Sequence, residues 1–110
     1  MMATTELRRI TRAFEQAVDM AARGSGDVNE RLVLAYKRYL VAVQPDALPP
    51  ALRARFLRLH EQVCDWPPGE PARDYSPHFR ALYPENAADL LAQLVELKNA
   101  LRLLLAEHEI

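Results

Sequence analysis

The chain has 110 residues, which suits one domain with a hydrophobic core and is too short for two. Half of the residues are hydrophobic, 26% are charged, and the formal net charge is −1. This balance excludes a disordered chain, and it excludes a domain whose bulk charge attracts nucleic acid or anionic membrane. We therefore expect a single helical domain over residues 1–110, with the helices assigned below.

The sequence also indicates the cellular compartment in which we expect the protein. It contains one cysteine, Cys64, so an intrachain disulfide framework is excluded and a reducing environment is expected. No apolar run is long enough to span a membrane, and the first residues do not resemble a secretion signal. We expect a cytoplasmic protein, and the heavy use of Arg, Ala and Leu suggests a bacterial source.

The first predicted helix runs from about Thr5 to Ala22, because apolar residues recur there at spacings of three and four. Its core-facing residues are Leu7, Ile10, Phe14, Ala17, Val18 and Ala21. Arg23 followed by Gly24 is a typical helix stop, since glycine readily takes the positive φ of that position.

The second predicted helix begins after Asp27, whose carboxylate can cap it, with Glu30 completing a capping box. Its main apolar stripe consists of Leu32, Tyr36, Tyr39 and Val43. Leu34 and Val41 fall nearly opposite this stripe at 100° per residue, so we expect them outside the core. Pro45 ends the helix, because the residue before a proline avoids the α conformation.

The third predicted helix is opened by Leu48-Pro49-Pro50 and closed by Pro67-Pro68-Gly69. Its apolar stripe consists of Leu52, Phe56, Leu59, Val63 and Trp66. Three prolines lie between Val43 and Leu52, which indicates a spacer rather than the tight turn of a helix-turn-helix motif.

Ser76-Pro77 reads as a cap and first-turn proline, which predicts a short helix through Leu82. The last helix is predicted from about Glu85 to Glu107. Its heptad-like seam consists of Leu90, Leu94, Leu97, Leu101 and Leu104. Because the connections between the first three helices are short, the sequence predicts an all-α antiparallel bundle of four main helices plus one short helix before the last.

The sequence shows no catalytic constellation, and we expect the protein not to be an enzyme. His60 and Cys64 share a helix face, but a zinc site needs three or four ligands and the other histidines lie elsewhere. We therefore expect no metal and no cofactor. An enzyme or ligand-binding bundle with a pocket near Tyr36, Tyr39 and His60 stays open as an alternative.

Apolar residues exceed what one core face per helix requires, which indicates a surface that binds another protein. The predicted interface consists of Leu34, Val41, Leu91, Val95 and Leu103. The sequence thus favours a small protein–protein interaction module of regulatory, adaptor or anti-activator type. Its partner is unidentified, and a homodimer is expected because small helical domains often complete their core with a second copy.

The alternative function is a DNA-binding transcriptional regulator that uses Arg53, Arg55 and Arg58 of the third helix. These arginines spread around the polar arc of the helix, and the whole domain is not basic. Nucleic acid is therefore the less favoured partner, and no membrane contact is expected.

Overall fold

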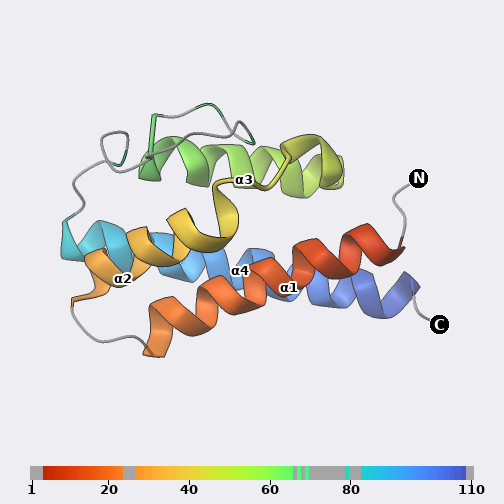
Figure 1. Ribbon diagram of the computed structural model, residues 1–110, viewed down its shortest axis with the longest axis horizontal. Coiled ribbons are helices and arrows are strands. Elements are labelled where there is room, and N and C mark those ends of the chain that lie inside the picture. The colour runs from red at the N-terminus through yellow and green to blue at the C-terminus, as the bar shows by residue number, and fades with distance from the viewer. Residues whose placement is uncertain are drawn as a thin grey trace.

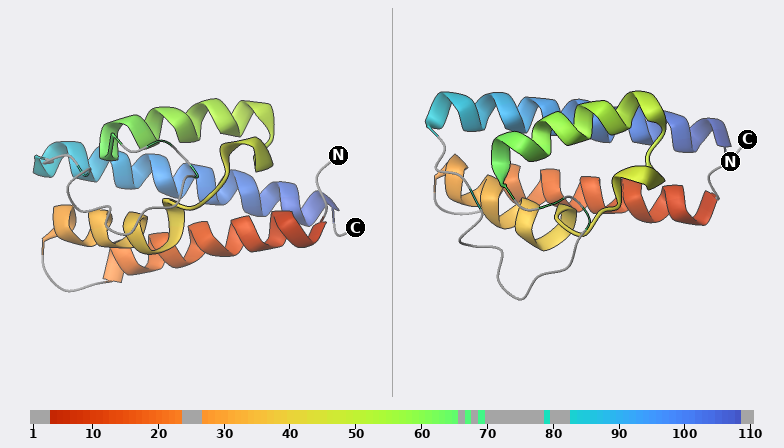
Figure 2. Two further views of the ribbon diagram at one scale, coloured as in Figure 1. Left: turned by 45° about the horizontal axis from the view of Figure 1, so that its top comes forward. Right: turned by 90° about the horizontal axis from the view of Figure 1, so that it is seen from above.

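The computed structural model describes residues 4–23, 27–65, 67, 69, 79 and 83–108. The helices are α1 (Thr4–Arg23), α2 (Val28–Ala35), the π-helical turn η1 (Tyr36–Leu40), the 3-10 turn η2 (Pro45–Ala47), α3 (Pro50–Val63) and α4 (Pro84–His108). Consecutive α-helices run in opposite directions (Figures 1 and 2), so the predicted all-α antiparallel bundle of four main helices is confirmed. The predicted short helix over 76–82 lies outside the described residues.

The two long helices, α1 and α4, pack along each other. The shorter α2 packs on both of them, and α3 packs on α4 (Figure 2). Thr4 and His108 lie at the same end of the bundle (Figure 1). None of the helices in the described part of the chain is long and apolar enough to cross a membrane.

The core joins all four helices through aromatic and leucine side chains. Phe56 of α3 meets Phe14 of α1 edge-on, with ring centroids 5.7 Å apart, and stacks on Tyr36 at 6.3 Å. The predicted seam of α4 is buried at Leu90, Leu94, Leu97 and Leu101. Burial of each of these leucine and aromatic side chains stabilises the folded state by about 1.5–3 kcal/mol. Their packing is therefore the main source of stability.

The join between α1 and α2 follows the predicted capping chemistry. The Asp27 carboxylate accepts a hydrogen bond from the backbone N–H of Glu30 at 2.9 Å, which confirms Asp27 as the N-cap. Arg31 donates from Nε to the carbonyl oxygen of Ala21 at 2.9 Å. This bond satisfies a carbonyl that the end of α1 would otherwise leave unpaired.

The prediction that Val41 lies outside the core is wrong, and η1 explains why. The backbone N–H of Val41 donates to the carbonyl oxygen of Tyr36 at 3.0 Å, a bond between residues five apart. In an α-helix five residues turn through about 500°, so residue 41 would lie 140° away from residue 36. The wider π turn instead brings Val41 above Tyr36, and its side chain is only 4% exposed.

Candidate functional site

A groove opens in the half of the bundle that α2 does not reach. α2 and η1 have 8 and 5 residues, whereas α1 has 20 and α4 has 25. At 1.5 Å per residue, α2 with η1 covers about 20 Å of an α1 helix about 30 Å long. After Leu40 the chain crosses to α3 through η2, so no α-helix of the described chain continues the line of α2.

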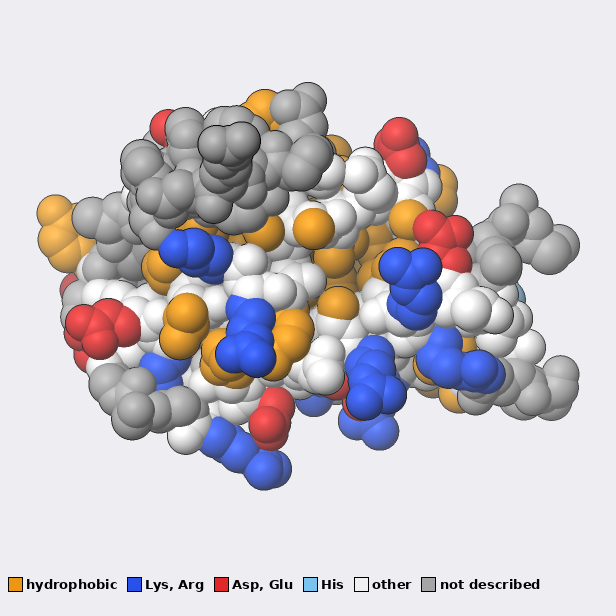
Figure 3. Space-filling model, viewed as in Figure 1, with side chains coloured by type: hydrophobic (Ala, Val, Ile, Leu, Met, Phe, Trp, Pro, Cys, Tyr) orange, Lys and Arg blue, Asp and Glu red, His pale blue; other side chains and the backbone are white. Residues whose placement is uncertain are grey.

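The groove consists of two adjoining hollows with volumes of about 260 and 570 Å³, which share Glu6 and Ala47. Its apolar lining consists of Leu7, Ile10, Ala13, Tyr39, Ala42, Val43, Ala47, Leu48, Pro49, Pro50 and Leu104. Figure 3 shows hydrophobic side chains in the hollow between α1 and the start of α3. The floor is buried, since Leu7 and Leu48 are 0% and 2% exposed. This arrangement is typical of a surface that receives apolar side chains.

Charged residues of both signs surround this apolar floor. Glu6 and Arg9 lie on α1, Asp46 on η2 and His108 at the end of α4, and all four are exposed. An apolar centre with a polar rim is the usual composition of a protein-binding surface.

Arg53 holds one wall of the groove in place. Its Nε donates to the carbonyl oxygen of Pro45 at 3.1 Å, and its Nη2 donates to the carbonyl oxygens of Asp46 at 3.3 Å and Leu48 at 3.1 Å. The guanidinium thus uses its donors on the backbone of η2 and the residue that follows. Arg53 is a structural residue of the groove wall and is not directed outward for phosphate contact.

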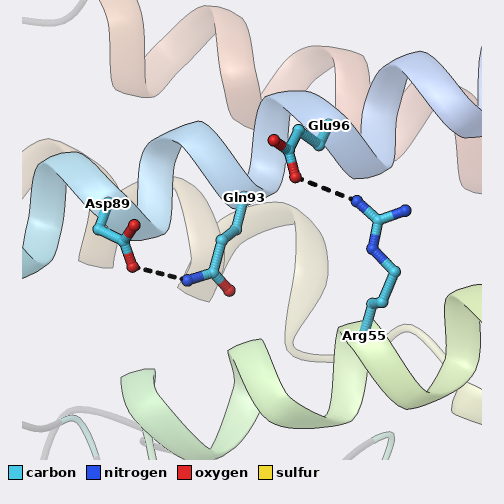
Figure 4. Close-up of polar contacts among 4 residues, drawn as sticks. All are labelled: Arg55, Asp89, Gln93 and Glu96. Atoms are coloured by element: carbon cyan, nitrogen blue, oxygen red, sulfur yellow. Dashed lines mark hydrogen bonds and ion pairs between the residues drawn. The ribbon is translucent and has the colours of Figure 1, made fainter.

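The other two arginines of α3 lie beside acidic groups. Arg55 forms an ion pair with Glu96 of α4, with Nη2 and Oε2 3.2 Å apart (Figure 4). One turn away along α4, Gln93 donates to the Asp89 carboxylate at 2.8 Å. Arg58 is exposed on the same side of α3. Because carboxylates border these arginines, the surface does not present the basic stripe that DNA binding needs, and the DNA-binding alternative gains no support.

None of the residues predicted as an interface lines the groove. Val41 lies in the core, Leu34 and Leu103 are exposed, at 55% and 65%, and Leu91 and Val95 are half-buried. Leu91 and Val95, four residues apart, share one face of α4, whereas Leu103 lies eight residues after Val95, about 80° round the helix and 12 Å further along. That these four exposed or half-buried residues contact a partner stays a prediction.

The pocket expected near Tyr36, Tyr39 and His60 is replaced by a buried polar cluster. The Tyr36 hydroxyl hydrogen-bonds to Nδ1 of His60, and His60 Nε2 lies 3.2 Å from Cys64 Sγ. Tyr36, His60 and Cys64 are 0%, 3% and 1% exposed, and the Phe79 ring covers Tyr36 at a centroid distance of 6.2 Å. Burial raises the pKa of Tyr36 well above its ordinary value, and the electrostatic interaction with Cys64 raises it further. The Tyr36 phenol therefore stays protonated inside packed core, and only Tyr39 lines the groove.

Metal ligation has no basis in the described part of the chain, where no three His, Cys, Asp or Glu side chains lie close enough to hold an ion. Comparison with protein-family models, with curated proteins and with solved structures finds no match to this chain. The proposed function therefore rests on the geometry of the groove alone.

Sequence reasoning missed the groove because it followed surplus apolar residues and not helix lengths. The second helix was expected to continue to the residues before Pro45. A usable signal was present, since Pro45, Pro49 and Pro50 leave no room for a further α-helix between α2 and α3. The sequence could not show that the regular α-helix ends at Ala35, with η1 as its continuation.

Proposed function

We propose that this chain is a small helical protein–protein interaction module of regulatory, adaptor or anti-activator type. It binds an amphipathic helix of another protein in the groove between α1 and the start of α3. The single observation that supports this is the apolar channel that continues the line of α2, where a further helix would complete the bundle. Helix-in-groove binding uses this geometry, in which one apolar face of a helix enters a channel lined by apolar side chains.

The groove limits what the partner helix can be. The α1 residues that line the groove run from Glu6 to Ala13, about 10 Å along the helix axis, which corresponds to roughly two helical turns. The lining side chains Ala13, Ala42 and Ala47 are small, so leucine-sized side chains of the partner can approach the floor. Glu6 and Arg9 on one rim favour a partner with charges of both signs beside its apolar stripe.

The setting we propose is the bacterial cytoplasm. Cys64 is the one cysteine of the chain, so it forms no intrachain disulfide, and it is buried in the core. A protein without disulfides is suited to a reducing compartment.

The proposal is tested with displayed libraries of helix-forming peptides, selected on the wild-type protein and then measured individually by fluorescence anisotropy. Ala42→Glu and Ala47→Glu place a carboxylate in the groove, and Ala92→Glu places one on the exposed side of α4 as a matched control. We expect at least tenfold weaker binding to both groove variants and unchanged binding to the control. Circular dichroism confirms that each variant is folded.

Two results would overturn the proposal. The first is a library from which no amphipathic helical peptide binds the folded wild-type protein. The second is a set of selected peptides that bind Ala47→Glu as tightly as the wild type, because their site would then lie elsewhere.

A further inference from the structure

The side of α1 that faces away from the groove carries charges arranged so that two antiparallel copies of it would present opposite charges to each other. Arg8 and Arg12 are followed by Glu15 and Asp19, and the members of each pair are four positions apart. At 100° per residue, all four lie within an arc of about 60°, so they form one straight strip about 16 Å long. The strip borders a shallow hollow of about 540 Å³ that Gln16 and Leu105 also line.

The pattern is antisymmetric about the midpoint between Ala13 and Phe14. If a second copy of α1 lies antiparallel on the first with a two-fold axis at that point, Arg8 faces Asp19 of the second copy. Arg12 then faces Glu15 of the second copy, and the symmetry repeats both pairs. Two basic residues opposite two acidic residues, each presented twice, give four ion pairs across one short helix contact.

Within a single chain the pattern combines one favourable pair, Arg12 with Glu15 three residues on, with two unfavourable ones. Like charges four residues apart on a helix repel, and the strip contains two such pairs, Arg8 with Arg12 and Glu15 with Asp19. Neither Arg12 nor Glu15 forms an ion pair with another residue of the described chain, and both are exposed. An antiparallel second helix places an opposite charge beside each of the four and removes both repulsions.

The contact that Asp19 makes within its own chain is compatible with this pairing. Asp19 forms an ion pair with Arg23, with Arg23 Nε and Oδ1 2.9 Å apart, and the two side chains are 60% and 82% exposed. A single exposed pair is weak and can rearrange when another cation approaches, whereas the proposed dimer brings four pairs together in one network. Leu105 of α4 is half-buried beside the strip and adds apolar area at its edge. Figure 3 shows acidic and basic side chains close together along the edge of the molecule where α1 runs.

We propose that the protein forms a two-fold homodimer through this α1 strip, with α1 antiparallel to α1 of the second copy. Glu6, Ile10 and Ala13, which line the groove, lie on the other side of α1 from Arg12 and Glu15. The dimer therefore leaves both grooves open. The inference rests on the charges of α1 and does not depend on what the grooves bind.

The test is a charge exchange measured by sedimentation velocity and light scattering over a range of protein concentrations. Arg8→Glu with Arg12→Glu makes the strip wholly acidic, and Glu15→Arg with Asp19→Arg makes it wholly basic. We expect a dimer for the wild type at about 0.01 M salt, a tenfold or greater loss of affinity in each double variant, and recovery of a dimer when the two variants are mixed. About 1 M salt should also dissociate the wild type, because exposed ion pairs are screened there.

Arg58→Glu, an exposed reversal on α3, is the control that must leave the dimer intact. A wild type that stays monomeric at low salt overturns the proposal, and so do double variants that still dimerise. Two monomeric variants that fail to associate when mixed also overturn it, since the strip would then recognise something other than a second copy. Matching circular dichroism spectra exclude unfolding as the cause of any change.

Discussion

Arg53 donates from Nε to the carbonyl oxygen of Pro45 at 3.1 Å and so ties the first turn of α3 to the turn before it. Its Nη2 reaches the carbonyl oxygens of Asp46 and Leu48 as well. One side chain thus fixes the segment that forms a wall of the groove. The shape of the groove depends on this brace, because η2 has only three residues and packs mainly on α3.

Replacing Arg53 with alanine should lower the free energy of unfolding by about 1–2 kcal/mol, because the half-buried carbonyls of Pro45 and Leu48 lose the hydrogen bonds from its guanidinium. Urea denaturation measures this loss, and hydrogen exchange at residues 46–48 reports the loosening of the wall. Arg58→Ala removes an exposed arginine from the same helix and should change stability by less than about 0.5 kcal/mol. Equal effects of the two substitutions would show that Arg53 does not brace the turn.

Tyr36 predicts a specific loss of stability in alkali. Its pKa is raised by burial in the folded state, whereas the unfolded tyrosine ionises near pH 10. Above that pH the unfolded chain releases a proton that the folded chain keeps, so stability falls as pH rises, by up to about 1.4 kcal/mol per pH unit. Below pH 10 this contribution is constant.

Tyr36→Phe tests that prediction. At pH 8 the variant should be less stable by about 1–3 kcal/mol, because His60 Nδ1 loses its buried partner. The difference from the wild type should shrink between pH 10 and pH 11 in urea denaturation. Tyr83→Phe, at a tyrosine that is 72% exposed, controls for loss of a hydroxyl group. A difference that stays constant with pH would contradict the assignment.

Gly69 cannot be replaced without strain. It has φ of +80°, and a Cβ built on it would lie 2.6 Å from Gln44 Oε1. The positive φ alone should make Gly69→Ala lower the free energy of unfolding by about 1–2 kcal/mol, and the clash with Gln44 adds to that loss. In the Gln44→Ala background the cost should be smaller, because the clash is gone and only the backbone strain remains. Thermal denaturation of the wild type, Gly69→Ala, Gln44→Ala and the double variant gives the coupling energy between the two residues. A coupling energy of zero would contradict the contact between residue 69 and Gln44.

Val41 and Leu34 should respond to truncation in opposite ways. Val41→Ala removes methyl groups from packed core and should lower the free energy of unfolding by about 2 kcal/mol. Leu34→Ala shortens an exposed side chain and should change it by less than about 0.5 kcal/mol. Chemical denaturation compares the two variants directly. A larger loss of stability for Leu34→Ala than for Val41→Ala would contradict the burial of Val41.

Periodicity predicts most of the fold because each helix buries one continuous stripe. The stripes through Leu7, Phe14 and Phe56, and the seam from Leu90 to Leu101, are buried in the structure. Asp27 likewise caps α2 as its side-chain chemistry requires. These features depend on residues within one or two turns of each other, which a sequence displays directly.

The surface could not be predicted in the same way. Assigning Val41 to an interface assumed that each residue turns the helix by 100°. The π turn at η1 has a smaller rotation per residue, so the assumption does not hold there. The role of Arg53 depends on the path of the chain after Gln44, which no periodic pattern encodes. The groove depends on where α2 stops relative to α1, a comparison of lengths that becomes meaningful only after the helices are docked.

The ends of the described chain meet at the mouth of the groove. Glu6 and Leu7 at the start of α1, and Leu104 and His108 at the end of α4, line the same hollow. A purification handle or reporter domain attached at either end of the described chain therefore starts beside the groove that we propose as the binding site. Interaction screens that use terminal fusions would under-report binding, whereas a bait immobilised through a cysteine introduced at Ala92 of α4 leaves the channel accessible.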